Sequence, residues 1–171
     1  MDIRTLKIFA EYNRKTNSDM NAIIQKLQAH QWNQEFKGYF NSIKSLCNHI
    51  YLADFNWLKR FSKLRKFSYI DNVLFTQDLG FGSVVFETIE EYLDKRKVLD
   101  AQMIEFVNGV AQDDLDKYLE YTDSHGKVHR RLFGGLVLHC FNHQTHHRGM
   151  ISIYLENMGI SNDYSNLVYM V

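Results

Sequence analysis

The sequence predicts an all-α protein, a single domain over residues 1–171 in which four long helices form a bundle and a small β-hairpin precedes the last helix. Two observations carry this prediction. Apolar residues recur at steps of three and four through four long segments, and the chain contains no proline, so little interrupts these helices. The chain also has no internal repeat or low-complexity linker, which favours one compact domain.

The first two helices are predicted from apolar stripes. Helical spacing indicates a helix over residues 2–29, whose stripe has one polar exception, Asn13. A second stripe predicts a helix over residues 40–65, with His49 midway along it. Because the connection between them is short, the two helices are expected to be antiparallel neighbours.

The third helix is expected after a long loop. Residues 66–82 have weak helical periodicity, and the glycines near their end are typical of a loop. Ser83 is the expected N-cap of a helix over residues 84–110, where apolar residues again recur at helical spacing and charged residues occupy the opposite face.

A β-hairpin is expected before the fourth helix. The strand-like segments 118–121 and 127–131 flank a polar reversal that contains aspartate and glycine. The last helix is predicted over residues 134–158, with Gly159 ending it and a short tail docked after it.

Charge and hydropathy exclude two classes of partner. Twenty basic and twenty acidic side chains cancel, so the chain lacks the positive potential that binds a phosphate backbone. No apolar segment approaches the roughly 18 residues that span a bilayer. We therefore expect that the protein binds neither nucleic acid nor a membrane and that it is located in the cytoplasm.

Five further residues are expected to have structural roles only. Cys47 and Cys140 are expected to be buried thiols and Trp57 a packing residue. The pair Arg130–Arg131 is expected to be a solvated corner.

Histidine is concentrated in one place, because four of the eight histidines lie between His139 and His147. His143 and His147 are four residues apart, so on a helix their imidazoles share a face and can reach one metal ion. His49 is the expected third ligand, since a buried imidazole on an apolar stripe needs a polar partner. His139 and His146 are expected to be further ligands or neighbours of the ligands.

The residues around the histidines narrow the kind of metal site. A metalloprotease motif needs a glutamate after its first histidine, and this chain has Gln144 there. Di-iron bundles need an acid three residues before a histidine, and no histidine here has one. One divalent ion on three imidazoles, with an open coordination position, fits best, with zinc or nickel ahead of iron, copper or manganese. The alternative is a metal-free bundle whose histidines bond carbonyls or one another.

The segment Asn142–Gly149 closely resembles the last-helix signature of the DinB family, bacterial "damage-inducible" four-helix proteins. The resemblance extends over essentially the whole chain. It is supported by further matches at Tyr12-Asn13-Arg14, at His49 with Ala53-Asp54 and Trp57, and at Tyr121-Thr122-Asp123-Ser124-His125-Gly126.

This resemblance implies a DinB/YfiT-type bundle in an up-down-down-up arrangement, with a divalent ion on His49, His143 and His147. It also implies kinship with thiol S-transferases that use bacillithiol or mycothiol, and with proteins that form dimers. Two residues depart from the family pattern. Met150 stands where the family usually has glutamine, and Lys15 where an aromatic residue is common.

Two functions follow as hypotheses. The first is a metal-dependent thiol S-transferase acting on electrophiles or xenobiotics, whose partners are a low-molecular-weight thiol and a small electrophile. Asn13, Arg148 and Tyr154 are then expected to orient the substrate and Met150 to face the site, with no catalytic residue assigned. The second is a non-catalytic metal-binding or stress-response module that forms a homodimer, which Met150 favours because its thioether replaces an amide.

Overall fold

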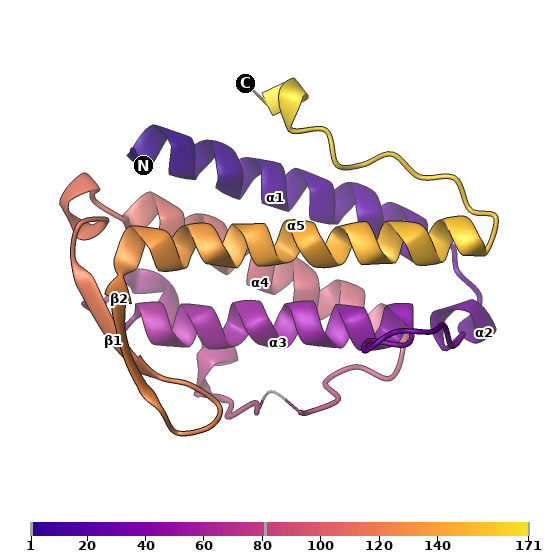
Figure 1. Cartoon of the computed structure of the whole chain (residues 1–171), viewed down its shortest axis with the longest axis horizontal. Helices are drawn as coiled ribbons and strands as arrows, with labels where there is room; N and C mark the ends of the chain where they lie inside the picture. Colours follow the sequence, from indigo (N-terminus) through magenta and orange to yellow (C-terminus); the bar gives the residue numbers. More distant parts are fainter. Residues whose placement is uncertain (1, 81, 171) are drawn as a thin grey trace.

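The computed structural model describes residues 2–80 and 82–170, and within them it confirms the predicted helical bundle with a hairpin before the last helix (Figure 1). The long helices are α1 (Ile3–Ile24), α3 (Ile43–Phe61), α4 (Ile89–Gly109) and α5 (Phe133–Asn157). The short α2 (Ala29–Trp32) follows α1, and strands β1 (Tyr118–Thr122) and β2 (Val128–Leu132) precede α5. Short 3-10 helices are Ser68–Asp71, Val73–Thr76, Gln112–Asp114 and Leu167–Met170.

The four long helices have the up-down-down-up arrangement, in which α1 and α5 run one way and α3 and α4 the other (Figure 1). Helices α1 and α3 each pack against both α4 and α5. The prediction that α1 and α3 are neighbours is therefore wrong, although they are antiparallel. Their connection crosses the end of the bundle diagonally, because Trp32 is buried against Tyr92 of α4 and Phe36 stacks on Tyr154 of α5.

Helix boundaries are set by capping residues and differ from the predicted ones. Helix α1 ends at Ile24 rather than near residue 29, and α3 is shorter at both ends, beginning after Ser42, whose hydroxyl accepts from the backbone of Ser45. Helix α4 begins after Thr88, not Ser83, because Thr88 and Glu91 form a capping box. The preceding backbone is instead held by Asn48, whose side-chain oxygen accepts from the amides of residues 85 and 86 at 2.7 and 3.0 Å.

The predicted hairpin and the end of the last helix are confirmed. Strands β1 and β2 pair antiparallel, and their turn contains Gly126 at a φ of +80°. Gly159 has a φ of +74°, the left-handed conformation that ends a helix, and the next amide bonds back to the carbonyl of Leu155. The tail then returns along α1, where the hydroxyl of Tyr12 donates to the carbonyl of Ser165.

The core occupies the space between the four helices and continues beneath the hairpin. Phe61, Phe106 and Phe133, from α3, α4 and α5, form ring contacts at the hairpin end, and Leu119 of β1 is buried there. Both cysteines are buried free thiols. Among the described residues, no helix combines the length and the apolar character that crossing a membrane would require.

Candidate metal centre

Helices α3 and α5 bring the three expected ligand histidines together. The Nε2 atom of His49 lies 3.0 Å from Nε2 of His143 and 3.1 Å from Nε2 of His147. The two histidines of α5 are 3.1 Å apart through the same atoms. One helical turn separates His143 from His147, and His49 meets both from the antiparallel helix α3. These three side chains form a group that could hold a metal ion.

Packing against Phe40 helps to orient two of these imidazoles. The Phe40 ring lies 4.2 Å from the ring of His49 and meets His147 edge-on at 5.3 Å. The buried Nδ1 atoms of His143 and His147 have no hydrogen-bonding partner among the described residues. Metal-bound histidines usually donate this second N–H to an oxygen. At His147 the Phe40 ring therefore packs on an imidazole whose Nδ1 has no hydrogen-bonding partner among the described residues.

The site favours neutral imidazoles. Burial lowers the pKa of His49 to about 4, and the adjacent His143 acts in the same direction. Burial also lowers the pKa of His143 and of His147 to about 4, with the surrounding histidines adding to the effect. A neutral imidazole keeps a free lone pair on one nitrogen, which is the form that binds a metal.

The donor set fits a divalent cation. Three nitrogen atoms about 3 Å apart cannot all direct lone pairs at one another without repulsion, and a neutral ring that carries its proton on Nε2 can donate to only one of the other two. A cation bound to all three nitrogens removes the repulsion, and zinc, nickel, copper and iron accept imidazole ligands. No carboxylate belongs to the group.

The other two histidines of the cluster lie outside this triangle of nitrogens. His139 is exposed one turn before His143, with its ring 6.0 Å from that of His143 and 5.5 Å from that of Trp57. His146 is also exposed, and its ring lies 4.8 Å from that of His147. Both are thus neighbours of the ligand group: His139 precedes it along α5, and His146 lies between His143 and His147 in the chain.

The expected substrate-orienting residues lie deeper than the ligands or away from them. Asn13 and Arg148 are buried and bonded to each other, with Arg148 donating to the Asn13 side-chain oxygen. Tyr154 is buried and donates to the carbonyl of Phe40 at 2.6 Å, so it supports the residue that packs on the ligands. Met150 is partly buried and packs against the core.

A buried network of charges beneath the ligands was missed by the sequence analysis. Arg96 of α4 is fully buried and donates to Asp54 of α3 at 2.7 Å and to Asp100 on its own helix. Asp54 also accepts from Gln144, the residue after His143. Burial raises the pKa of Asp54 to about 6 against the effect of Arg96. The available signal was the position of Arg96 on the otherwise apolar stripe of the third predicted helix.

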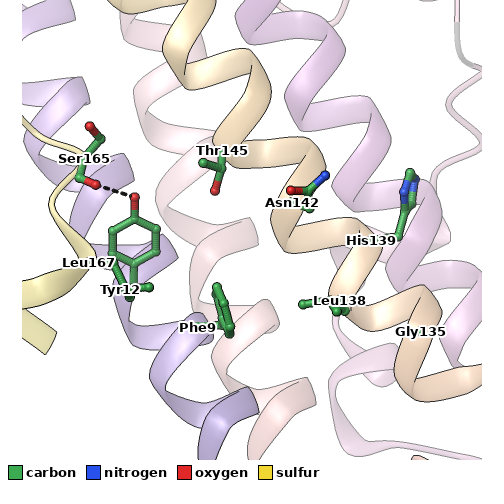
Figure 2. A pocket seen from close by; sticks show the side chains of 9 residues that line it. All are labelled: Phe9, Tyr12, Gly135, Leu138, His139, Asn142, Thr145, Ser165 and Leu167. Carbon is green, nitrogen blue, oxygen red and sulfur yellow. Dashed lines mark hydrogen bonds between the residues drawn. The ribbon is translucent and has the colours of Figure 1, made fainter. Parts of the chain in front are cut away.

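An apolar cavity on the α1 side of α5 is separate from the ligands. It measures about 600 Å³ and lies between α1, α5 and the tail, with Phe9, Tyr12 and Leu138 among its lining residues (Figure 2). None of the three ligand histidines lines it. A second cavity of about 360 Å³ adjoins His49 and is bordered by Phe40 and Asn48.

Comparison with known proteins shows the family of this chain. The family model described as "DinB family" matches residues 1–168. The chain is also similar to "Protein DinB" of Bacillus subtilis (strain 168), with 27% identity over 163 residues, which cover 94% of this chain and 91% of that protein. The matched region includes both helices that carry the three histidines. On the strength of that match, the chain belongs to the DinB family.

Proposed function

We propose that the protein holds one divalent metal ion on Nε2 of His49, His143 and His147, and that this centre serves a thiol S-transferase reaction. The observation that carries the proposal is the convergence of three neutral imidazole nitrogens within 3.1 Å of one another. Zinc or nickel suits this donor set best, and iron, copper and manganese are the other candidates.

The donor set also supports a thiol as the co-substrate. Three neutral ligands leave the positive charge of a divalent ion uncompensated, which favours an anion such as a thiolate at an open position. The bound ion would supply Lewis acidity that lowers the pKa of that thiol. The thiolate sulfur then forms a bond to an electrophilic carbon, and the leaving group departs with its bonding pair.

The chain's own residues would move the proton and shape the site. We assign the thiol proton to His139 or His146, which are exposed and whose rings lie beside those of His143 and His147, respectively. Phe40 packs on two ligand rings and keeps water from that side. Met150 offers no amide to hold a substrate, so substrate recognition is assigned to other residues.

Conjugation of 1-chloro-2,4-dinitrobenzene to a panel of thiols tests this function. The panel comprises glutathione, cysteine, coenzyme A, bacillithiol and mycothiol. Metal-loaded wild type should accelerate conjugation with at least one thiol, His143→Ala should lose the acceleration, and His30→Ala, a change at an exposed histidine of α2, should retain it. Equal rates for wild type and His143→Ala with every thiol would remove the transferase proposal.

The non-catalytic alternative rests on Met150 and on the two Nδ1 atoms without partners. In that case the ion stabilises a metal-binding or stress-response module, which we propose as a homodimer. Metal loading would then raise the melting temperature or change the oligomeric state, while no thiol in the panel is conjugated.

A further inference from the structure

A third cavity lies under the hairpin, between α3 and α5, the two helices that carry the ligands. Its volume is about 360 Å³, and it is lined by Trp57, Tyr121, Arg131, Leu132, Gly135, Leu136 and His139. The Trp57 ring meets the rings of Tyr121 and His139 edge-on at 5.3 and 5.5 Å. Three aromatic rings therefore border a space large enough for one or two fused rings.

The strand register aims Arg131 at this cavity. In the antiparallel pair Arg131 lies opposite the buried Leu119, so both side chains are on the face of the hairpin that meets the helices. Arg130 lies opposite Glu120, on the outward face. Although it is on the inner face, Arg131 remains exposed, and it pairs with no carboxylate among the described residues.

Two arginine side chains, Arg60 and Arg131, place positive charge at the rim of the cavity. The guanidinium of Arg60 lies 4.9 Å from the centre of the Trp57 ring and 5.2 Å from that of Tyr121. The nearby acid, Asp123, accepts from His129 at 2.8 Å and from two backbone amides of the turn, which satisfies its charge. An anionic group at the rim would meet Arg131, a residue suited to planar carboxylates.

His139 connects this cavity to the ligands. It lines the cavity, and its ring lies 6.0 Å from that of His143. The aromatic ring of a molecule bound beside Trp57 would thus lie next to His139, which in turn neighbours His143. His139 also borders the apolar cavity between α1 and α5, but the other lining residues of that cavity come from α1, α5 and the tail, and none comes from α3, which carries His49 and Trp57 (Figure 2).

We infer that this cavity binds a planar aromatic carboxylate of one or two rings, and that such a molecule, carrying an electrophilic carbon, is the substrate that receives the thiol. Trp57, Tyr121 and His139 contact the ring, and Arg131 pairs with the carboxylate. The inference rests on the proposed function, because it assigns the electrophile of that same site. It gives Trp57 and Arg131 roles beyond packing and solvation.

Binding of 2-naphthoate, measured by NMR on metal-free protein, tests the inference without any turnover. The indole N–H signal of Trp57 is identified by its loss in Trp57→Phe. It should shift on titration with 2-naphthoate, while the signal of Trp32, buried at the other end of the bundle, stays in place. 2-Naphthalenemethanol, which has the same rings without the charge, should bind about tenfold more weakly, as expected on losing one charge-assisted pair.

Matched variants separate recognition from folding. Arg131→Gln should weaken 2-naphthoate about tenfold and leave 2-naphthalenemethanol unchanged, whereas Arg130→Gln on the outward face should change neither. Gly135→Leu places a side chain where a Cβ meets nothing within 4 Å, so it should fill the cavity without disturbing α5 and abolish binding. Gly149→Leu, equally open but outside the cavity, should bind as wild type does.

The outcomes distinguish the two proposals. If 2-naphthoate shifts the Trp57 signal in an Arg131-dependent way while no thiol is conjugated to any electrophile, binding of an aromatic carboxylate in this cavity is supported, and the transferase function is contradicted together with the assignment of this molecule as its substrate. If 1-chloro-2,4-dinitrobenzene is conjugated but 2-naphthoate leaves the Trp57 signal unmoved, the transferase stands and this inference is overturned. Equal binding by wild type and Arg131→Gln also overturns it.

Discussion

At the scale of single residues, the ligand histidines hold their nitrogens in a geometry that disfavours protonation of the imidazoles and suits a metal ion. Their Nε2 atoms are 3.0 to 3.1 Å apart, and burial together with mutual proximity lowers each pKa to about 4. A free histidine titrates near pH 6.5. The three imidazoles are thus neutral and available as ligands well below neutral pH.

Metal affinity should consequently persist into mild acid. We expect the dissociation constant for zinc to change little between pH 8 and about pH 5.5 and to rise steeply as the pH approaches the pKa of about 4. Competition with a chromophoric chelator of known pH dependence measures this. Loss of affinity with an apparent pKa near 6.5 would show that the imidazoles titrate as they do in water.

The free energy of unfolding of the metal-free protein should depend on pH for the same reason. The folded-state pKa of each histidine lies below the unfolded value, so the unfolded chain binds more protons between about pH 4 and 6.5. This contribution to stability is therefore present above pH 6.5 and is lost as the pH falls toward 4.

At the scale of elements, close contacts and caps position α5 with its two ligands. Helix α5 begins directly after β2, and the amide of Gly134 donates to the carbonyl of Leu115 at 3.0 Å. A Cβ at Gly134 would lie 3.0 Å from that carbonyl oxygen, whereas a Cβ at Gly135 would meet nothing within 4 Å. Contact with Leu115 therefore disfavours a side chain at Gly134, whereas no contact disfavours one at Gly135.

Alanine at these two positions should act in opposite directions. Gly134→Ala should lower the free energy of unfolding by about 1–3 kcal/mol, because the backbone of Leu115 must move. Gly135→Ala should raise it by about 0.5–1 kcal/mol, because alanine loses less backbone entropy in a helix. Urea unfolding of both variants measures the difference, and equal effects would contradict the contact at Gly134.

Periodicity predicted the existence and type of these elements, but their ends depended on tertiary contacts. The 3.6-residue pattern found all four long helices, and Gly159 marked the end of the last one. The start of α4 was placed too early because Ser83 is a plausible cap in isolation. In the fold Asn48 of α3 holds residues 85 and 86, so the helix starts at Ile89, after Thr88.

At the scale of the whole molecule, a buried polar network joins all four long helices beside the ligands. Asn17 of α1 donates to Asp100, Arg96 joins Asp100 to Asp54, and Asp54 accepts from Gln144 of α5. Gln144 follows the ligand His143 in the chain. This network links the packing of α1, α3 and α4 to the helix that presents two of the three imidazoles.

Removing the charge at the centre of this network should destabilise the entire bundle. Arg96→Met leaves Asp54 and Asp100 buried without their cation, which should cost about 3–5 kcal/mol of unfolding free energy. Lys97→Met removes a charge from the exposed adjacent position and should change stability by less than about 0.5 kcal/mol. Similar urea midpoints for the two variants would show that the network adds nothing to stability.

The overall arrangement was only partly predictable. The helix spacing of His143 and His147 indicated two ligands, and the place of His49 on an apolar stripe indicated the third, 94 residues from His143 in the chain. The diagonal placement of α1 and α3 was not predictable from a short connection, since it depends on Trp32 and Phe36 packing across the end of the bundle. The role of Arg96 required knowing that two acids face it.

Metal content tests the central claim most directly. Protein purified without a histidine tag, before and after reconstitution with zinc or nickel, is analysed by plasma mass spectrometry alongside His49→Ala, His143→Ala and the control His30→Ala. We predict about one ion per chain in wild type and in His30→Ala, and none in the two ligand variants, each of which is left with two of the three imidazoles. No bound ion in reconstituted wild type, or an equal content in all four proteins, would contradict a metal centre on His49, His143 and His147.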